Sequence, residues 1–324
     1  MSNRSYGNSQ IIDLYGNDHS PWVQSVLLCL YDKNINYNLR TIPTLNLLFK
    51  SGVMMPAMKD ASNKWKLDSA EILQKLGNDS LSSSEKKLIF KTWQGVQHRV
   101  DNPLTFFYAF SLCKGFHNNK VFNLYNHALR PLTSIYFFTL LNIIKIKIRK
   151  FTINEKFFDQ YSYWNDKLLT QSTNYFGGDA PNIIDYQLFG VIQCHCSIPY
   201  SPLIKTLQEN TELSHLRKWI SNMHIKFADY PHLYSADYFN PKQETIQKAS
   251  IIEKITYWSG LFIFLLILPF TVVLILSLLM RRKWNFTRNL HTLKITAVSV
   301  AIQYLHKVAL LSGSSFSSVS HWFI

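Results

Sequence analysis

The chain has 324 residues, of which 47% are hydrophobic and 17% are charged, and this composition excludes an intrinsically disordered protein. Its formal net charge of +14 suits an anionic partner, either nucleic acid or a membrane surface. The sequence has no basic run with interleaved aromatic residues and no zinc-finger spacing, so we expect no nucleic acid partner. The four cysteines form no disulfide framework, which indicates a reducing compartment.

The N-terminal segment predicts a strand, a helix and a second strand. IIDLYG at 11–16 is typical of a short strand, a helix begins at Pro21, and NINYNLRTI at 34–42 alternates as a strand does. Ser20 followed by Pro21 is typical of a helix N-terminus. Two interpretations of Ser20 stay open here. It either caps the helix, or it is a nucleophile position whose hydroxyl is stabilised by the free N–H groups of the helix end.

Two short strands and a helix are predicted next, over SGVMMPAMKD, NKWKL and LDSAEILQKLG (51–77). Proline cannot donate to a strand ladder, so Pro56 marks either an edge strand or a cis Met55–Pro56 bond that exposes the backbone of Met55 to a ligand. Asp68 and Ser69 start the helix. They form either an ordinary cap or a site where Ser69 holds a carboxylate and Asp68 an ammonium group.

From the polar linker at 78–87 to about Tyr230, the pattern predicts helices and no internal repeat. Asn182 and Asp185 have the spacing of a capping box at the start of an apolar helix, so we predict a role in folding for them. The basic and apolar residues of IIKIKIRK at 143–150 indicate a solvated helix end or, alternatively, a contact with anionic lipid heads.

Cys194, His195 and Cys196 are ligand types that metals prefer. Their consecutive spacing cannot place all three side chains on one face of a helix. We therefore predict no metal site there, and none elsewhere in the sequence.

The segment from Tyr257 to Met280 carries no charged residue over 24 positions. That length suffices to cross a hydrocarbon core of about 30 Å, and aromatic and basic residues flank the segment as they do at membrane interfaces. We therefore predict a transmembrane helix over 257–280. A second, amphipathic or membrane helix is predicted over 295–311, where polar residues form one stripe.

The N-terminus has no apolar core of the length that a secretory signal needs, so we expect the domain before the membrane to lie in the cytosol. A single crossing would then put the basic run Arg281–Lys283 on the far side, against the positive-inside tendency. Pro269 in the middle of the segment offers an alternative, because it could bend the helix into a shallow re-entrant hairpin. The layout of the tail after residue 281 stays open.

Together, the Ser-Pro helix start, Met55-Pro56 between strands and Asp68-Ser69 resemble the N-terminal domain of the glutathione S-transferase superfamily. The stretches YFGGDAPNIIDYQLFGVIQ (175–193) and HLRKWISNMHIKFADYPHL (215–233) resemble conserved parts of its helical domain. The resemblance implies that Ser20 activates the thiol of glutathione. It also implies that Met55 with Pro56 pairs with the cysteinyl backbone of glutathione, and that Asp68 and Ser69 hold its γ-glutamyl end.

The implied fold is an α/β thioredoxin-like domain over 10–77 and an all-α domain over 88–235, followed by the transmembrane helix at 257–280. Glutathione is the implied substrate or ligand. The other implied partners are a lipid bilayer and an apolar small molecule that would be conjugated or isomerised, and the resemblance also allows a homodimer.

Within the superfamily, FKTWQGVQHRV (90–100) and the segment 130–150 are similar to the membrane-associated type-2 prostaglandin E synthase branch. That branch carries Cys-Pro-x-Cys where this chain has Ser20-Pro21-Trp22-Val23, so both thiols are replaced and dithiol redox chemistry is not expected. The Ser20 hydroxyl would donate a hydrogen bond to a thiolate, and we expect His19 to be a solvated turn residue.

The metaxin group is similar in architecture, because it joins the same double domain to a C-terminal membrane anchor, but it has no transferase activity. Two functions therefore stay open. The chain is either a membrane-anchored glutathione transferase-like protein or a non-catalytic binding or assembly protein of the same fold.

Overall fold

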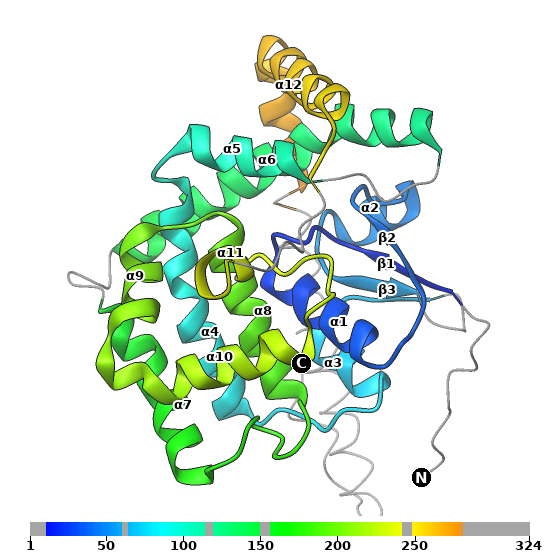
Figure 1. Cartoon of the computed structure of the whole chain (residues 1–324). Coiled ribbons are helices and arrows are strands. Elements are labelled where there is room, and N and C mark those ends of the chain that lie inside the picture. Colours follow the sequence, from blue (N-terminus) through cyan, green and yellow to red (C-terminus); the bar gives the residue numbers. More distant parts are fainter. Residues whose placement is uncertain are drawn as a thin grey trace, which may run out of the picture.

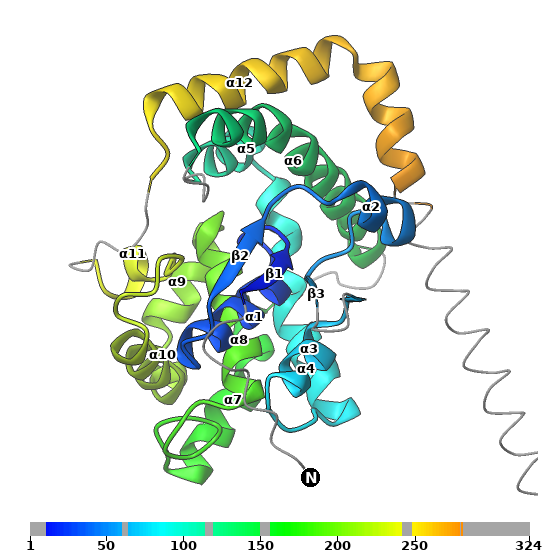
Figure 2. The ribbon, with the colours of Figure 1, turned by 90° about the vertical axis from the view of Figure 1, so that its right-hand side faces the viewer.

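The computed structural model describes residues 11–59, 64–113, 119–149, 156–241, 248–278 and 280 (Figures 1 and 2). The predicted helix at 295–311 lies outside these residues. The elements in chain order are β1 (Ile12–Tyr15), α1 (Pro21–Asp32), β2 (Tyr37–Arg40), α2 (Leu45–Ser51), β3 (Ala57–Lys59), β4 (Trp65–Lys66), α3 (Ser69–Lys75), α4 (Ser83–Trp93), η1 (Gln94–Val100), α5 (Pro103–Leu112), α6 (Lys120–Arg149), α7 (Phe157–Gln171), α8 (Ile183–Ser197), α9 (Ser201–Glu209), η2 (Thr211–Leu213), α10 (Ser214–Lys226), α11 (Ala236–Phe239) and α12 (Ile251–Leu266).

The N-terminal domain is a four-stranded mixed sheet in the order β2-β1-β3-β4. β1 runs parallel to β2 with Ile12 opposite Tyr37, and antiparallel to β3 with Tyr15 opposite Ala57. The parallel pair needs a crossover, which α1 supplies. A helical domain follows the sheet, so the predicted fold class is confirmed as far as a small α/β domain followed by a helical domain.

Two features differ from the sequence prediction, an additional helix and the start of α4. α2 was not expected; Thr44 caps it by accepting a hydrogen bond from the backbone N–H of Leu47 at 3.3 Å. α4 begins at Ser83, inside the segment predicted to be a linker. Ser82 and Glu85 form a capping box there with both reciprocal hydrogen bonds present, so a serine-rich segment starts a helix.

The two domains share one hydrophobic core in which α1 packs against α8. Gly190 makes this close packing feasible, since a Cβ at that position would lie 2.5 Å from the backbone oxygen of Pro21. The N-terminus of α1 is thereby held against the helical domain. This contact fixes the position of Ser20, which directly precedes α1.

The start of α8 confirms the predicted capping box. Asn182 accepts from the backbone N–H groups of Ile184 and Asp185, and the Asp185 carboxylate accepts from the N–H of Asn182 at 2.9 Å. Asp185 also accepts from the indole Nε1 of Trp219 at 2.7 Å. Burial raises the pKa of Asp185, and the hydrogen bonds from Asn182 and Trp219 oppose that rise. The box therefore joins α8 to α10, consistent with a folding role.

A second core lies between α5, α6 and α12. In Figure 2, α12 crosses above α5 and α6. Three contacts fix it on α6: His127 Nε2 lies 3.3 Å from Glu253 Oε1, the hydroxyls of Ser134 and Tyr257 are 2.9 Å apart, and a Cβ on Gly260 would lie 2.3 Å from the oxygen of Ala128. α12 is thus part of the folded body.

The prediction of one continuous helix over 257–280 is wrong. α12 ends at Leu266, and a second helix, Leu268–Leu278, leaves it at a bend of 94°. The physical reason is Pro269, which has no N–H to donate and whose ring clashes with the preceding turn. Thr271 stabilises the bend, since its hydroxyl donates to the oxygen of Phe264 at 2.9 Å.

Within the described part of the chain, one helix is long and apolar enough to cross a membrane by length and composition, the stretch Lys120–Ile146 of α6. The bent pair Ile251–Leu266 and Leu268–Leu278 passes the same test only if the two helices count as one span. α6 packs against η1, α5 and α12, so its apolar residues also serve the core.

Candidate functional site

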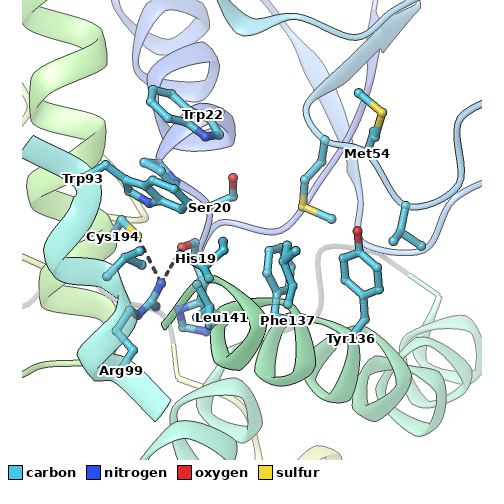
Figure 3. Close-up of a pocket in the computed structure, with 16 residues that line it drawn as sticks. His19, Ser20, Trp22, Met54, Trp93, Arg99, Tyr136, Phe137, Leu141 and Cys194 are labelled. Carbon is cyan, nitrogen blue, oxygen red and sulfur yellow. Dashed lines mark hydrogen bonds between the residues drawn. The ribbon is translucent and has the colours of Figure 1, made fainter. Parts of the chain in front are cut away.

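The turn between β1 and α1 carries Ser20 and is held by its own polar groups. The side chain of Asn17 accepts from the backbone N–H of His19 at 2.9 Å, and the backbone oxygen of Asn17 accepts from Ser20 N–H at the same distance. Ser20 is the N-cap residue of α1, yet its side chain makes no capping hydrogen bond. Its hydroxyl faces a cavity between Trp93 and Met54 (Figure 3). The structure therefore favours an available hydroxyl at a helix N-terminus over a plain cap.

The Met55–Pro56 peptide bond is cis, as one of the two sequence interpretations proposed. The bond leads directly into β3, which pairs with β1 and so brings Met55 next to the turn that carries Ser20. The backbone N–H of Asn17 lies 3.3 Å from the sulfur of Met55. Strand pairing thus joins two parts of the predicted site that are far apart in sequence.

Asp68 and Ser69 lie at the N-terminus of α3. The Asp68 carboxylate accepts from the backbone N–H groups of Ala70 at 2.8 Å and Glu71 at 3.1 Å, so Asp68 is the helix cap. The Ser69 hydroxyl accepts from the side-chain amide of Gln187 on α8 at 3.1 Å. The cap was one of the two interpretations of Asp68, and an exposed carboxylate that caps a helix retains lone pairs for a ligand.

Two adjoining cavities contain all five predicted site residues. The first, about 300 Å³, is lined by Met55, Pro56, Asp68 and Ser69, with Gln187 opposite. The second, about 110 Å³, contains Ser20. Trp22, Met54 and Met55 line both. The larger cavity offers polar groups and the smaller one is mainly apolar, so an elongated ligand with a polar end would place its other end at Ser20.

Arg99 is a site residue that the sequence reasoning did not select. It is buried, lines the Ser20 cavity, and donates through Nη1 to the backbone oxygen of His19 at 3.1 Å and through Nη2 to the hydroxyl of Ser197 at 2.8 Å. Burial lowers the pKa of Arg99, but a guanidinium stays charged in proteins. A positive charge beside Ser20 favours an anion there. In the sequence, only the family resemblance of the stretch 90–100 pointed toward Arg99.

His19 is not a solvated turn residue, so that expectation is wrong. Its side chain points away from the Ser20 hydroxyl into the protein, where Nε2 lies 3.2 Å from the sulfur of Cys113. Its ring lies 4.4 Å from that of Phe110 and 5.5 Å from that of Tyr234. Burial lowers the pKa of His19 to about 3, so the imidazole is neutral at physiological pH.

The neighbouring Asp18 ties this turn to the C-terminal part of the helical domain. Its carboxylate is buried, accepts from the hydroxyl of Tyr234, and lies 3.2 Å from Nδ1 of His232. Burial alone raises the pKa of Asp18, and the contact with His232 and the hydrogen bond from the Tyr234 hydroxyl outweigh it and hold the pKa well below its usual range.

The same cluster has the residue types of a metal site. Ligand atoms of Asp18, His19 and Cys113 lie within 4.8 Å of one another. These side chains already contact one another and Tyr234, since the Cys113 sulfur lies 3.2 Å from Nε2 of His19 and 3.5 Å from the Tyr234 hydroxyl oxygen. We therefore interpret the cluster as a buried hydrogen-bond network that holds the turn.

Cys194 and His195, neighbours in sequence on α8, face different surroundings. Cys194 lines the Ser20 cavity, with its sulfur 3.1 Å from Nη1 of Arg99. His195 faces a different neighbour, because its Nε2 lies 3.3 Å from the backbone oxygen of Thr92. The side chains therefore point to different partners, as their spacing on a helix requires.

No protein-family model matches the sequence, and no curated protein matches it. Among solved structures, the chain is similar to a possible glutathione S-transferase from Rhodopseudomonas palustris, with a TM-score of 0.39 and 15% identity over 67% of this chain and 95% of that one. It is also similar to glutathione transferase F7 from Populus trichocarpa, with a TM-score of 0.35 and 18% identity over 71% of this chain and 99% of that one. A third is glutathione S-transferase unclassified 2 from Bombyx mori, with a TM-score of 0.37 and 12% identity over 73% of this chain and 99% of that one. At TM-scores and identities this low, these similarities do not bear on the chemistry of this chain.

Proposed function

We propose that this chain is a membrane-associated, glutathione transferase-like protein that binds glutathione in the two adjoining cavities. The observation that carries the proposal is the convergence of Met55, Pro56, Asp68 and Ser69 on one cavity and of Ser20 on the next. The polar γ-glutamyl end would lie at the N-terminus of α3, where Asp68 meets the ammonium group and Ser69 the carboxylate. The thiol would lie beside Ser20.

In this arrangement Ser20 donates a hydrogen bond to the sulfur. A serine hydroxyl is too weak a base to remove the thiol proton, but a fixed donor and a nearby positive charge both lower a thiol pKa. Arg99 supplies that charge from the wall of the same cavity. His19 is not the base, since its ring faces Cys113. The thiol proton goes to solvent, and the thiolate then attacks an electrophile.

The reaction we propose is addition or displacement at an apolar electrophile. For an aryl halide, a carbon–sulfur bond forms, the carbon–halogen bond breaks, and halide leaves with the bonding electrons. The mainly apolar lining of the Ser20 cavity, which includes Trp22, Phe137 and Leu141, suits such a partner. Isomerisation of a lipid-like substrate would use the same thiolate.

The alternative is a non-catalytic binding or assembly protein of the same fold, as in the metaxin group. Replacement of both thiols of the Cys-Pro-x-Cys turn by Ser20 and Val23 favours it. In that case, glutathione could bind while no conjugate forms. Attachment to a membrane through the apolar residues after Lys254, with the folded domain in the cytosol, belongs to either version of the proposal.

The test is calorimetric titration of the full chain, in mild detergent, with glutathione. We expect Ser69→Ala to weaken binding by about 1–3 kcal/mol, because it removes a partner of a charged carboxylate. Ser201→Ala is the matched control, since Ser201 is the exposed first residue of α9 as Ser69 is the first residue of α3. Unchanged binding in Ser69→Ala, or no binding by the unaltered chain at millimolar glutathione, would refute the site.

A second measurement separates the two versions. Turnover of glutathione with an aryl halide, reduced in Ser20→Ala while glutathione affinity changes little, would identify the transferase. Binding without turnover in the unaltered chain would identify the non-catalytic protein.

A further inference from the structure

The outer face of the bent helix pair, α12 with Leu268–Leu278, is apolar where a water-facing helix would be polar. The inner face of α12 packs on α6 through Tyr257, Gly260 and Leu261, which are buried. The opposite face exposes large apolar side chains, including two that flank the bend: Leu266 is 67% and Phe270 78% exposed. A helix that is apolar on both faces, with one face already packed, requires an apolar environment on the other.

The hydroxyl groups of the pair favour lipid over a protein partner. Thr256 donates to the oxygen of Ile252 at 2.8 Å, Thr271 to that of Phe264 at 2.9 Å and Ser277 to that of Val273 at 2.8 Å. Each of these three hydroxyls is thus satisfied by a backbone oxygen within the bent pair, as required where no water is available. Protein interfaces, in contrast, form about one hydrogen bond per 100–200 Å².

The dimensions favour insertion into one leaflet over a full crossing by this pair. At 1.5 Å per residue, the arm from Tyr257 to Leu266 is about 15 Å long and the arm Leu268–Leu278 about 16 Å. The 94° bend lies at an outer corner of the molecule (Figure 2). With both arms inclined equally, the corner reaches a depth of about 11 Å, within one leaflet whose hydrocarbon is about 15 Å thick.

The charges agree with both ends of the pair lying on one side. Lys254 precedes the uncharged segment and Arg281–Lys283 follow it in the sequence. In a single crossing these basic groups would lie on opposite sides of the bilayer, with the larger group on the far side. In a one-leaflet arrangement all of them meet the same anionic head groups.

We propose that the bent pair enters one leaflet of a bilayer corner first, with Leu266–Phe270 deepest, and does not cross it. The docked α12 then holds α5 and α6 beneath the head groups, and the glutathione site lies on the same side. This inference rests on the membrane attachment in the proposed function but not on glutathione binding.

The experiment uses the full chain bound to sealed vesicles of phosphatidylcholine and phosphatidylserine. Single cysteines are introduced by Ile251→Cys, Phe270→Cys and Met280→Cys, three exposed positions at the start, bend and end of the pair; the native cysteines are buried. We expect a membrane-impermeant thiol reagent added outside to label the cysteines at 251 and 280 and to spare the one at 270. A fluorophore at 270 should be quenched by brominated acyl chains.

Protection of the cysteine at 280 from outside, with labelling after the vesicles are opened, would overturn the one-leaflet arrangement and leave membrane attachment intact. Failure of the unaltered chain to float with the vesicles would overturn both. Glutathione titration reports separately on the site. Phe270→Glu should reduce the vesicle-bound fraction at least tenfold, whereas Ile225→Glu, at an equally exposed isoleucine on α10, should leave it unchanged; equal binding by both variants would also refute the proposal.

Discussion

Asp68 combines two roles at one carboxylate. It caps α3 through hydrogen bonds from Ala70 and Glu71, and it lines the larger cavity of the site. Both cap bonds use the same oxygen, Oδ1. The two roles make different demands on the side chain. A helix cap needs only one acceptor oxygen, whereas an ammonium ligand needs the negative charge of the carboxylate.

We predict that Asp68→Ala lowers the free energy of unfolding by about 1 kcal/mol, because α3 loses its cap. Asp68→Asn keeps an acceptor oxygen and should change stability by only a few tenths of that. Both variants should bind glutathione more weakly, because both lack the charge. Urea unfolding and calorimetry on the same samples check this. Normal glutathione affinity in Asp68→Asn would show that Asp68 is a cap and nothing more.

At the scale of elements, the contact between α12 and α6 decides where the apolar C-terminal part lies. The two helices approach closely at Gly260, and polar contacts of Glu253 and Tyr257 fix their register. Small residues allow helices to approach in this way. A transmembrane helix free of the domain would need none of these contacts.

Gly260→Ala should therefore separate the two helices. Its Cβ would lie 2.3 Å from the oxygen of Ala128, a backbone atom that cannot rotate away. We expect a loss of about 1–3 kcal/mol in unfolding free energy, the usual effect of overpacking. Ser259→Ala, at the exposed position just before it, is the control. If the two variants unfold at the same denaturant concentration, α12 is not docked on α6.

The stability of the whole molecule depends on pH through its buried histidines. Burial lowers the pKa of His19 to about 3 and that of His224 to about 4, from an ordinary value of 6.5. Below pH 6.5 the unfolded chain therefore binds protons that the folded chain does not. The free energy of unfolding must fall as the pH drops from 6.5 toward about 4, by about 1.4 kcal/mol per pH unit for each group.

His224→Gln should reduce that slope by about 1.4 kcal/mol per pH unit, since it removes one of the buried histidines whose pKa is lowered. The measurement is denaturant unfolding of the full chain in detergent at a series of pH values between 4 and 6.5. Ser221→Ala, which removes no titratable group at an exposed position on the same helix, should leave the slope as it is. An unchanged slope in His224→Gln would mean that this imidazole is already charged in the folded protein.

Features whose partners lie within a few residues could be predicted from the sequence. Asn182 and Asp185 satisfy each other three positions apart, the Ser20-Pro21 pair starts a helix, and Met55-Pro56 forms the cis bond. Apart from α2, the order of strands and helices in the N-terminal domain followed from the same short-range patterns. These signals are local because a helix end or a turn must satisfy its own backbone groups.

Only the tertiary structure decided which distant residues meet. Asp18 and His232 are 214 positions apart, and Gln187 reaches Ser69 across 118; no periodicity indicates such pairs. Arg99 stands beside Ser20 for the same reason. The uncharged run at 257–280 indicated a segment that needs apolar surroundings. The path of its two helices depended on the docking of Gly260 against α6 and on Thr271, which stabilises the bend at Pro269. Composition determines which solvent a segment prefers, whereas packing against the rest of the chain determines how it is oriented in that solvent.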